Sequence, residues 1–229
     1  MSREKREIVT PSQLLGDTNS SKAGRGTFIE KGKIYSERMG LLNKISDFIN
    51  VIPLKGRYEP IEKDFVIGII EEPLSSSWLV DINAPYPALL HTNEVPWDVE
   101  FGETDKYLNR GDSIMAKILD VGIEKNIQIT LKDQKDHNLY KISGGYITNI
   151  EPSKVPRLIG KEGSMITLLK KYTKCRIHVG KNGRIWIKGE NEKISKVLQV
   201  IKKIETESIY YGLTDRIEGL LKKDANEVQ

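Results

Sequence analysis

The chain has 229 residues, of which 38% are hydrophobic and 30% are charged, and its formal net charge is +4. This length leaves room for two or three small domains rather than one large core. No segment approaches the roughly 18 consecutive apolar residues of a membrane-spanning helix, and no apolar signal core follows the charged N-terminus. We therefore expect a cytoplasmic protein with no membrane partner.

A single cysteine, Cys175, excludes an internal disulfide bond, which fits a reducing compartment. The histidines are scattered without the spacing of metal ligands, so neither a zinc site nor a Cys–His nucleophile is predicted. Metal-dependent RNA hydrolysis needs converging carboxylates, and the pair Glu71-Glu72 has no matching acidic neighbours in the sequence. We expect no cofactor, no metal and no catalytic residue.

Residues 1–59 are predicted to form a small all-β domain. The segment up to about residue 21 suits a mobile arm followed by a short strand or turn, and a polar, glycine-rich loop comes next. Short apolar runs separated by turn residues are typical of strands. Four such strands are expected: Thr27–Glu30, Lys33–Ser36, Gly40–Ile45 and Phe48–Pro53.

Residues 60–138 are predicted to form a second β domain. Five strands are expected at residues 64–70, 78–82, 88–91, 112–119 and 127–131. This number and spacing fit the small barrel of an OB fold. The domain resembles the S1 type more narrowly, because the third strand runs into the His-x-x-Glu turn of His91 and Glu94, and the pair Gly111-Asp112 opens the fourth strand.

S1 domains usually place two aromatic side chains before and on the second strand, where they stack RNA bases. In this chain the corresponding positions are Ser76 and Leu79. Each stacked base contributes ~1–3 kcal/mol, so we expect the barrel to bind RNA weakly unless another side chain substitutes. Three side chains could do so: Trp78, Tyr86 and His91. For Trp78 and Trp97 we favour packing in the core or in a subunit interface.

Residues 143–229 are predicted to form an α+β domain with a C-terminal helical extension. In chain order we expect a strand at 146–150, a short helix from Ser153 to Ile159, a Gly-x-x-Gly loop at 160–163, and a helix with apolar residues at 165, 168, 169 and 172. Two strands at 175–179 and 184–188 follow, joined by the turn 180–183, and a long helix begins near Asn191. From about residue 143 to 210 this order resembles a type I KH domain, whose loop clamps single-stranded RNA.

The Gly-x-x-Gly loop has a physical reason to bind a nucleic-acid backbone. Gly160 and Gly163 have no Cβ atoms, so a sugar-phosphate chain can lie against the loop. Ser164 is expected to cap the next helix, whose amides would point at phosphate. The motif alone is weak evidence, because most such sequences are ordinary turns between helices. The predicted RNA-binding residues are Arg157, Ile159, Gly160, Lys161, Glu162, Gly163, Ser164, Lys170, Lys171, Lys181, Arg184 and His91.

Positive charge is concentrated in the same region. Residues 154–188 contain ten Lys and Arg residues and one carboxylate, a net charge of +9, so the rest of this +4 chain carries −5. A solvated face would also explain a run of charge, but the coincidence with the glycine loop favours a site for a polyanion. A second possible RNA surface is the outward face of the KH sheet, which would carry Arg176, His178, Arg184, Trp186 and Lys188.

The whole chain resembles the RNA-binding cap subunits of the archaeal exosome: a small β domain, an S1 barrel and a KH domain. The sequence motifs that carry this resemblance are Gly24-x-Gly26-Thr27, Val51-Ile52-Pro53-Leu54, Tyr58-x-Pro60, Asp64-x-Val66-Ile67-Gly68 and the single Gly-x-x-Gly loop. The resemblance implies a multidomain fold, mainly β plus α+β, and an accessory protein that is not a nuclease.

It further implies three copies in a trimeric cap on a hexameric ring of phosphorolytic subunits. Such a cap feeds single-stranded RNA 3′ ends into the pore for 3′-5′ degradation or tailing. We expect the two β domains to hold the protein on the ring, with apolar candidates at Trp78, Tyr86, Pro87 and Trp97. The alternatives are a free-standing S1-KH factor in transcription or translation and, as a more distant third, an enzyme.

Overall fold

The computed structural model describes residues 7–122, 124, 126–132, 139–207 and 216–219. The chain divides into two compact units, Met1–Gly56 and Arg57–Gln229, which are described separately. None of the helices within the described residues is long and apolar enough to cross a membrane.

The N-terminal unit consists of two small sheets. One has the order β1 (Ile8–Val9), β6 (Gly40–Ile45), β7 (Phe48–Pro53), β3 (Lys22–Ala23), and the other has the order β2 (Leu14–Asp17), β5 (Lys33–Ser36), β4 (Thr27–Glu30). The small β domain predicted from the sequence is confirmed. Alternation places Ile34, Ile49 and Val51 inside, each at most 2% exposed. Gly26 has φ +69°, and a Cβ there would lie 2.6 Å from the Val51 carbonyl oxygen, so this position requires glycine.

The second unit begins with a closed barrel. Its strands are β8 (Phe65–Pro73), β9 (Ser77–Asp81), β10 (Ala88–His91), β11 (Ser113–Val121) and β12 (Ile127–Thr130). They pair in the order β12-β10-β9-β8-β11, and the pairing of β11 with β12 closes the ring. The register shifts between Ile70 and Glu72 and between Ile118 and Asp120, and such bulges bend strands into a barrel. The predicted OB-like S1 barrel is confirmed.

Trp78 lies in the barrel core and is fully buried. Its Nε1 donates hydrogen bonds to the carbonyl oxygens of Thr104 at 3.2 Å and Leu108 at 3.1 Å. The prediction that Trp78 packs in the core is therefore confirmed. The prediction that Trp78 contacts the hexameric ring of exosome subunits is wrong, because its side chain is fully buried. Trp97 is partly buried and stacks on Tyr107, with ring centroids 6.0 Å apart. Tyr86 remains on the surface, 47% exposed.

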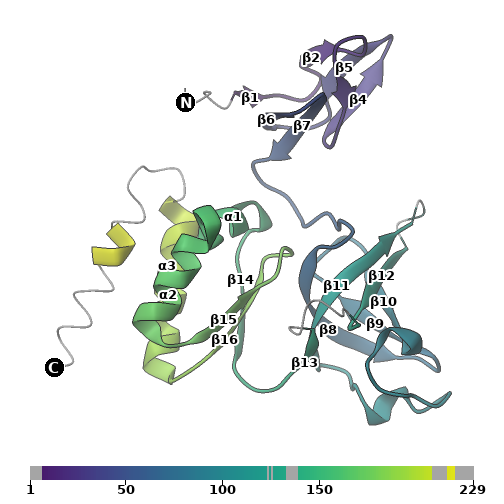
Figure 1. The fold of residues 1–229 in the computed structure, drawn as a ribbon, viewed down its shortest axis with the longest axis vertical. Helices are drawn as coiled ribbons and strands as arrows, with labels where there is room; N and C mark the ends of the chain where they lie inside the picture. The colour runs from purple at the N-terminus through teal and green to yellow at the C-terminus, as the bar shows by residue number, and fades with distance from the viewer. Residues whose placement is uncertain (1–6, 123, 125, 133–138, 208–215, 220–229) are drawn as a thin grey trace. The chain divides into compact units, whose positions relative to one another are not determined.

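The KH domain follows β13 (Tyr140–Ile142), which pairs with β11 at the edge of the barrel. Its elements are β14 (Tyr146–Asn149), η3 (Pro152–Lys154), α1 (Val155–Ile159), η4 (Lys161–Gly163), α2 (Ser164–Thr173), β15 (Arg176–Val179), β16 (Arg184–Lys188) and α3 (Asn191–Glu207). The antiparallel sheet has the order β14-β16-β15, and the three helices lie on one of its faces (Figure 1). This is the element order predicted for a KH domain.

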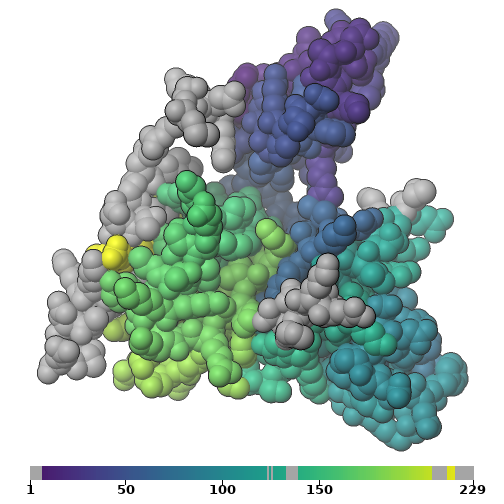
Figure 2. Space-filling model, viewed as in Figure 1, coloured from purple at the N-terminus to yellow at the C-terminus, as the bar shows by residue number. Residues whose placement is uncertain are grey.

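The other face of the KH sheet packs against the barrel. Trp186 of β16, 4% exposed, forms an apolar cluster with Ile67 and Met115 of the barrel and with Ile142 of β13. In the space-filling view the green KH domain and the teal barrel lie against each other (Figure 2). The prediction that this sheet face is a second RNA surface is wrong, because its centre is buried in the junction between the two domains.

Hydrogen bonds of the turn 180–183 also hold this junction. The Asn182 side chain is fully buried, and its Nδ2 donates to the carbonyl oxygens of Ile67 and Ile82, both at 2.8 Å. Its Oδ1 accepts from the Ile67 N–H at 3.3 Å, and Asn83 Nδ2 donates to the Asn182 carbonyl at 2.7 Å. One side chain thus joins the KH hairpin to two segments of the barrel.

Replacing Asn182 with alanine is expected to lower the free energy of unfolding by about 2 kcal/mol or more, because the Ile82 carbonyl and the Ile67 N–H lose the Asn182 side chain. The Ile67 carbonyl then keeps only the Arg184 guanidinium from the KH hairpin. Urea unfolding measures this loss. The matched control is Lys181→Ala: the Lys181 side chain is exposed and only its backbone N–H binds the barrel, so a change within about 0.5 kcal/mol is expected. Equal unfolding midpoints for Asn182→Ala and the natural protein would contradict the role of this side chain.

Candidate nucleic-acid interface

The Gly-x-x-Gly loop joins α1 to α2 with backbone angles that favour glycine. Gly160 has φ +78° and ψ 173°, Glu162 has φ +52°, and Gly163 has φ +80°. A Cβ on Gly160 would lie 2.7 Å from the Met165 backbone nitrogen, so the loop closes against itself there. A Cβ on Gly163 would make only an ordinary van der Waals contact, with Ile166 Cγ2 at 3.8 Å, so packing does not exclude a side chain there. Gly160 is thus required by the fold, whereas Gly163 leaves the outer surface of the loop clear.

The prediction that Ser164 caps α2 is wrong. Gly163, in the left-handed conformation, occupies the N-cap position, and Ser164 already has helical angles of φ −57° and ψ −44°. Within the described stretch 139–207, no side chain at that N-cap makes a capping hydrogen bond. The first amide of α2, the Ser164 N–H, instead donates to the Lys161 carbonyl oxygen, and the Gly163 N–H donates to the Gly160 carbonyl at 3.3 Å, so the backbone of the loop itself closes the start of the helix.

A groove of about 290 Å³ lies beside the loop. Its lining comes from the helices, from strand β15 and from the barrel: Ile159, Ile166, Lys170, Ile177, His178, Val179 and Phe65. Most of these groups are apolar, and the exposed Lys170 adds a cation. Strand β15 is the edge of the KH sheet, and an edge strand presents backbone N–H and C=O groups beyond its own sheet. The groove therefore combines an apolar lining with hydrogen-bonding groups and positive charge.

Most of the predicted RNA-binding residues gather on this surface. Arg157, Lys161, Glu162, Ser164 and Lys170 are exposed on α1, the loop and α2, and Ile159 lines the groove itself. Lys171 is also exposed on α2, and its Nζ lies 5.8 Å from the centre of the Tyr172 ring. Lys181 is exposed on the turn, while its backbone N–H donates to the Phe65 carbonyl at 2.7 Å.

Two predicted residues lie elsewhere. Arg184 is only 6% exposed, and its guanidinium forms an ion pair with the Asp81 carboxylate and donates to the carbonyl oxygen of Ile67 at 3.3 Å. Arg184 therefore lies in the junction between the KH domain and the barrel and does not line the groove. His91 lies on the barrel in a separate cavity of about 310 Å³, where its Nδ1 accepts from the Asn93 N–H at 3.1 Å.

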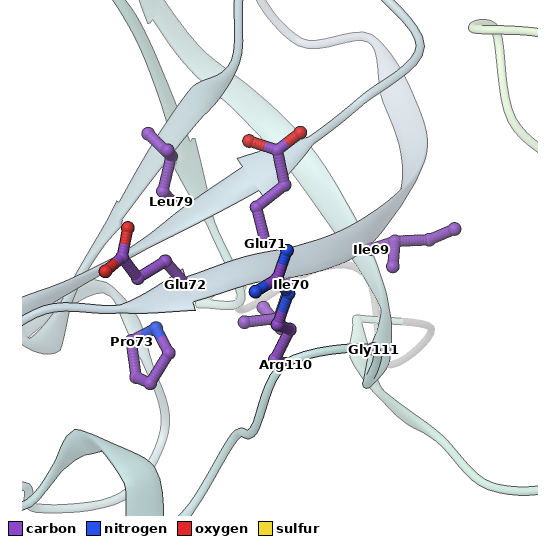
Figure 3. A pocket seen from close by; sticks show the side chains of 8 residues that line it. All are labelled: Ile69, Ile70, Glu71, Glu72, Pro73, Leu79, Arg110 and Gly111. Atoms are coloured by element: carbon purple, nitrogen blue, oxygen red, sulfur yellow. The ribbon is translucent and has the colours of Figure 1, made fainter.

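The barrel face that carries Leu79 differs in character from the KH groove. A cavity of about 600 Å³ lies there, and Figure 3 shows the side chains of Glu71, Glu72, Leu79 and Arg110 around it. The lining combines two carboxylates with the Arg110 guanidinium and includes no aromatic side chain, so its charge is less favourable to phosphate than that of the KH groove. In the parts of the chain that the structure describes, no three His, Cys, Asp or Glu side chains are grouped to hold a metal ion.

Sequence reasoning missed several groove residues. Ile177 and Val179 could have been found, because alternation along β15 places them on the helix side of the sheet, and Ile166 follows from the helical spacing of α2. Phe65 could not have been found in this way, since it belongs to the barrel and lies almost 100 residues earlier in the chain.

Two family models match the chain. Residues 145–193 match a KH domain, which includes the glycine loop and every groove residue except Phe65. Residues 6–55 match the N-terminal domain of the exosome RNA-binding protein RRP4. The second match covers almost the whole N-terminal unit.

Complete relatives extend this similarity over the full fold. The exosome complex component Rrp4 of Methanosarcina acetivorans is 45% identical over 219 residues, which are 96% of this chain and 83% of that protein. The protein of the same name from Picrophilus torridus is 41% identical, over 96% of this chain and 94% of its own length. A crystal structure of a candidate exosome complex RNA-binding protein has a TM-score of 0.67 at 32% identity, covering 76% of this chain and all of that one. The chain therefore belongs to the Rrp4 family of exosome complex components.

Proposed function

We propose that this protein is a non-catalytic, cytoplasmic RNA-binding subunit of an exosome, which holds single-stranded RNA and delivers its 3′ end to a phosphorolytic exoribonuclease ring. The observation that carries the proposal is the pair of positive-φ glycines beside the apolar groove, in a segment with a net charge of +9. The relatives described above are named as exosome components, so a free-standing RNA-binding factor is not favoured.

The groove suits an unpaired strand. The sugar-phosphate chain would lie across Gly160 and Gly163, where the second glycine leaves the surface clear. The exposed Lys161 and Lys170 would offset the phosphate charge, and bases would turn towards the apolar lining. Bases in a duplex are stacked and paired and cannot enter a groove of this kind, so single strands are the expected ligand.

The N-terminal unit is the proposed attachment to the ring. Its large apolar side chains are unusually exposed, at 38–60% of their surface: Ile8, Leu14, Phe28, Ile29, Met39, Ile45, Phe48 and Ile52. Exposed apolar groups on so small a unit are typical of a protein interface. Three copies on a hexameric ring, as the family resemblance implies, are part of this proposal.

A delivery assay tests the function. With Mg²⁺ and inorganic phosphate, the protein alone should leave 5′-labelled single-stranded RNA intact. The intact protein should accelerate degradation by the ring about tenfold or more at low RNA concentration, because a tethered RNA has a high effective concentration. A variant lacking residues 1–56 should bind RNA but give no acceleration.

The deletion ends at Gly56 because Tyr58 is 5% exposed in the barrel core and donates a hydrogen bond to Asp64 at 2.8 Å. Two results would contradict the proposal: RNA degradation by the protein alone that disappears on mutating one of its carboxylates, or ring binding that survives the deletion unchanged.

A further inference from the structure

We propose that the nucleotide site extends beyond the KH domain, and that Phe65 of the barrel forms one wall of the groove and contacts an unpaired base of the bound RNA. The inference rests on the proposed function of the groove and adds to it a residue from another domain. The ligand at this wall is an RNA base, because the groove continues directly from a loop suited to a sugar-phosphate backbone.

Phe65 is the first residue of β8, and it lines the groove together with residues of α1, α2 and β15. Its side chain is partly buried and packs against the junction cluster of Ile67, Met115, Ile142 and Trp186. The ring is therefore supported from the barrel side and reaches the groove at the end where β15 meets the turn 180–183. It forms a wall of the groove and is not a freely moving surface residue.

The position of Phe65 relative to the KH domain is tightly determined. Its carbonyl accepts a hydrogen bond from the Lys181 N–H at 2.7 Å, and the backbone of Ile67, two residues later, is paired with the Asn182 side chain. On the barrel side, Phe65 pairs with Lys117 in the β8–β11 ladder. An aromatic group held in this way loses little conformational freedom when a base binds, which is the condition for an efficient stacking surface.

The chemistry around Phe65 fits a base better than a polypeptide. The groove offers an apolar lining, a strand edge and the cation of Lys170, in a segment with a net charge of +9 that attracts a polyanion. The volume of about 290 Å³ is at the small end of the ~300–1,000 Å³ of ligand pockets, which suits one planar base. The barrel lacks aromatics at Ser76 and Leu79, and at Phe65 it presents one to the KH groove instead.

A site shared by two domains couples RNA binding to their association. RNA that touches both Phe65 and the KH loop binds the docked arrangement better than a separated one, so it stabilises the junction by mass action. The amides of residues 180–183 should therefore exchange hydrogen more slowly when RNA is bound.

The test uses the full chain and a fluorescently labelled, unstructured RNA of roughly eight nucleotides, longer than the four that a Gly-x-x-Gly loop clamps. Phe65→Ala should weaken binding by about 5- to 150-fold, the equivalent of the ~1–3 kcal/mol that one stacking aromatic contributes. Phe65→Tyr should stay within about twofold of the natural protein, because it keeps the ring. The matched control is Phe101→Ala: Phe101 is 83% exposed on a barrel loop, and its loss should leave the affinity unchanged.

Two further variants keep the test decisive. Phe65→Leu preserves most of the apolar packing at the junction, so its urea midpoint should stay close to that of the natural protein while RNA affinity falls; equal affinity would overturn the inference. Phe65→Trp adds a tryptophan whose fluorescence bound RNA should quench.

If the double variant Lys161→Asp/Glu162→Asp weakens RNA binding and the Phe65 variants do not, the proposal of a shared wall is wrong and the proposal of the KH loop as the clamp stands. If neither weakens binding, the RNA binds at another surface, and both the shared wall and the assignment of the KH groove are wrong. In this assay, only a protein that fails to bind RNA at all would contradict the proposed function.

Discussion

Replacing Lys161 and Glu162 together with aspartate is expected to weaken single-stranded RNA binding about 30-fold at low salt. Both side chains are exposed and both glycines remain, so the loop should keep its conformation. The change removes one cation and adds one anion beside the phosphates. At ~1 kcal/mol for each unit charge at close range in water, the two changes cost about 2 kcal/mol.

Salt dependence identifies the kind of contact that is lost. Lys161 would bind a phosphate and not a base edge, so the affinity should fall equally for all RNA sequences. The slope of log K against log salt should become shallower by about one unit. Fluorescence anisotropy at several salt concentrations measures both effects. If the variant binds RNA as tightly as the natural protein at low salt, the loop is not the clamp, and the cavity lined by His91 becomes the next candidate.

Valine at Gly163 is expected to weaken RNA binding still more, by about 100-fold, while the protein remains folded. At φ +80°, a residue with a side chain costs about 1–2 kcal/mol of stability. The added Cβ meets nothing closer than Ile166 Cγ2 at 3.8 Å, so the branched side chain is expected to obstruct the RNA backbone more than the fold of the protein. Gly163→Ala should give a smaller loss of affinity with a similar backbone cost, because it adds one carbon atom and no branch.

Gly160→Val is the matched comparison for this prediction. Its Cβ would lie 2.7 Å from the Met165 backbone nitrogen and 2.8 Å from Ser164 Oγ, and ψ 173° with φ +78° is accessible essentially to glycine alone. We therefore expect a clearly larger fall in the urea midpoint for Gly160→Val than for Gly163→Val. Unchanged RNA binding by a folded Gly163→Val protein would contradict the proposed path of the RNA backbone.

The barrel and the KH domain have different roles in the proposed RNA binding. The barrel carries Glu71, Glu72 and Leu79 on the face where S1 domains usually stack bases, so this face has little to attract RNA. The KH groove has the glycine loop and the exposed lysines. The barrel instead contributes Phe65 to the groove and Asn83 and Asp81 to the junction that positions it.

The sequence by itself determined most elements of each domain and the position of the glycine loop, but it did not predict the short strands β1, β3 and β13. Strand alternation, helical spacing and the glycine pair at 160 and 163 are local properties, because each depends on residues only a few positions apart. The same is true of the charge of residues 154–188. The five barrel strands, the four longer hairpin strands of the N-terminal unit, the KH element order and the family resemblance follow from these local features.

Only the tertiary structure decided which surfaces of those elements remain available. Alternation shows that Arg184 and Trp186 share one face of the KH sheet, but not that this face is covered by another domain. That outcome depends on the fit between two surfaces and on hydrogen bonds such as those between Asn182 and Ile67, which are 115 residues apart. The burial of Arg184 and the presence of Phe65 in the groove follow from this docking, which leaves no periodic pattern in the sequence.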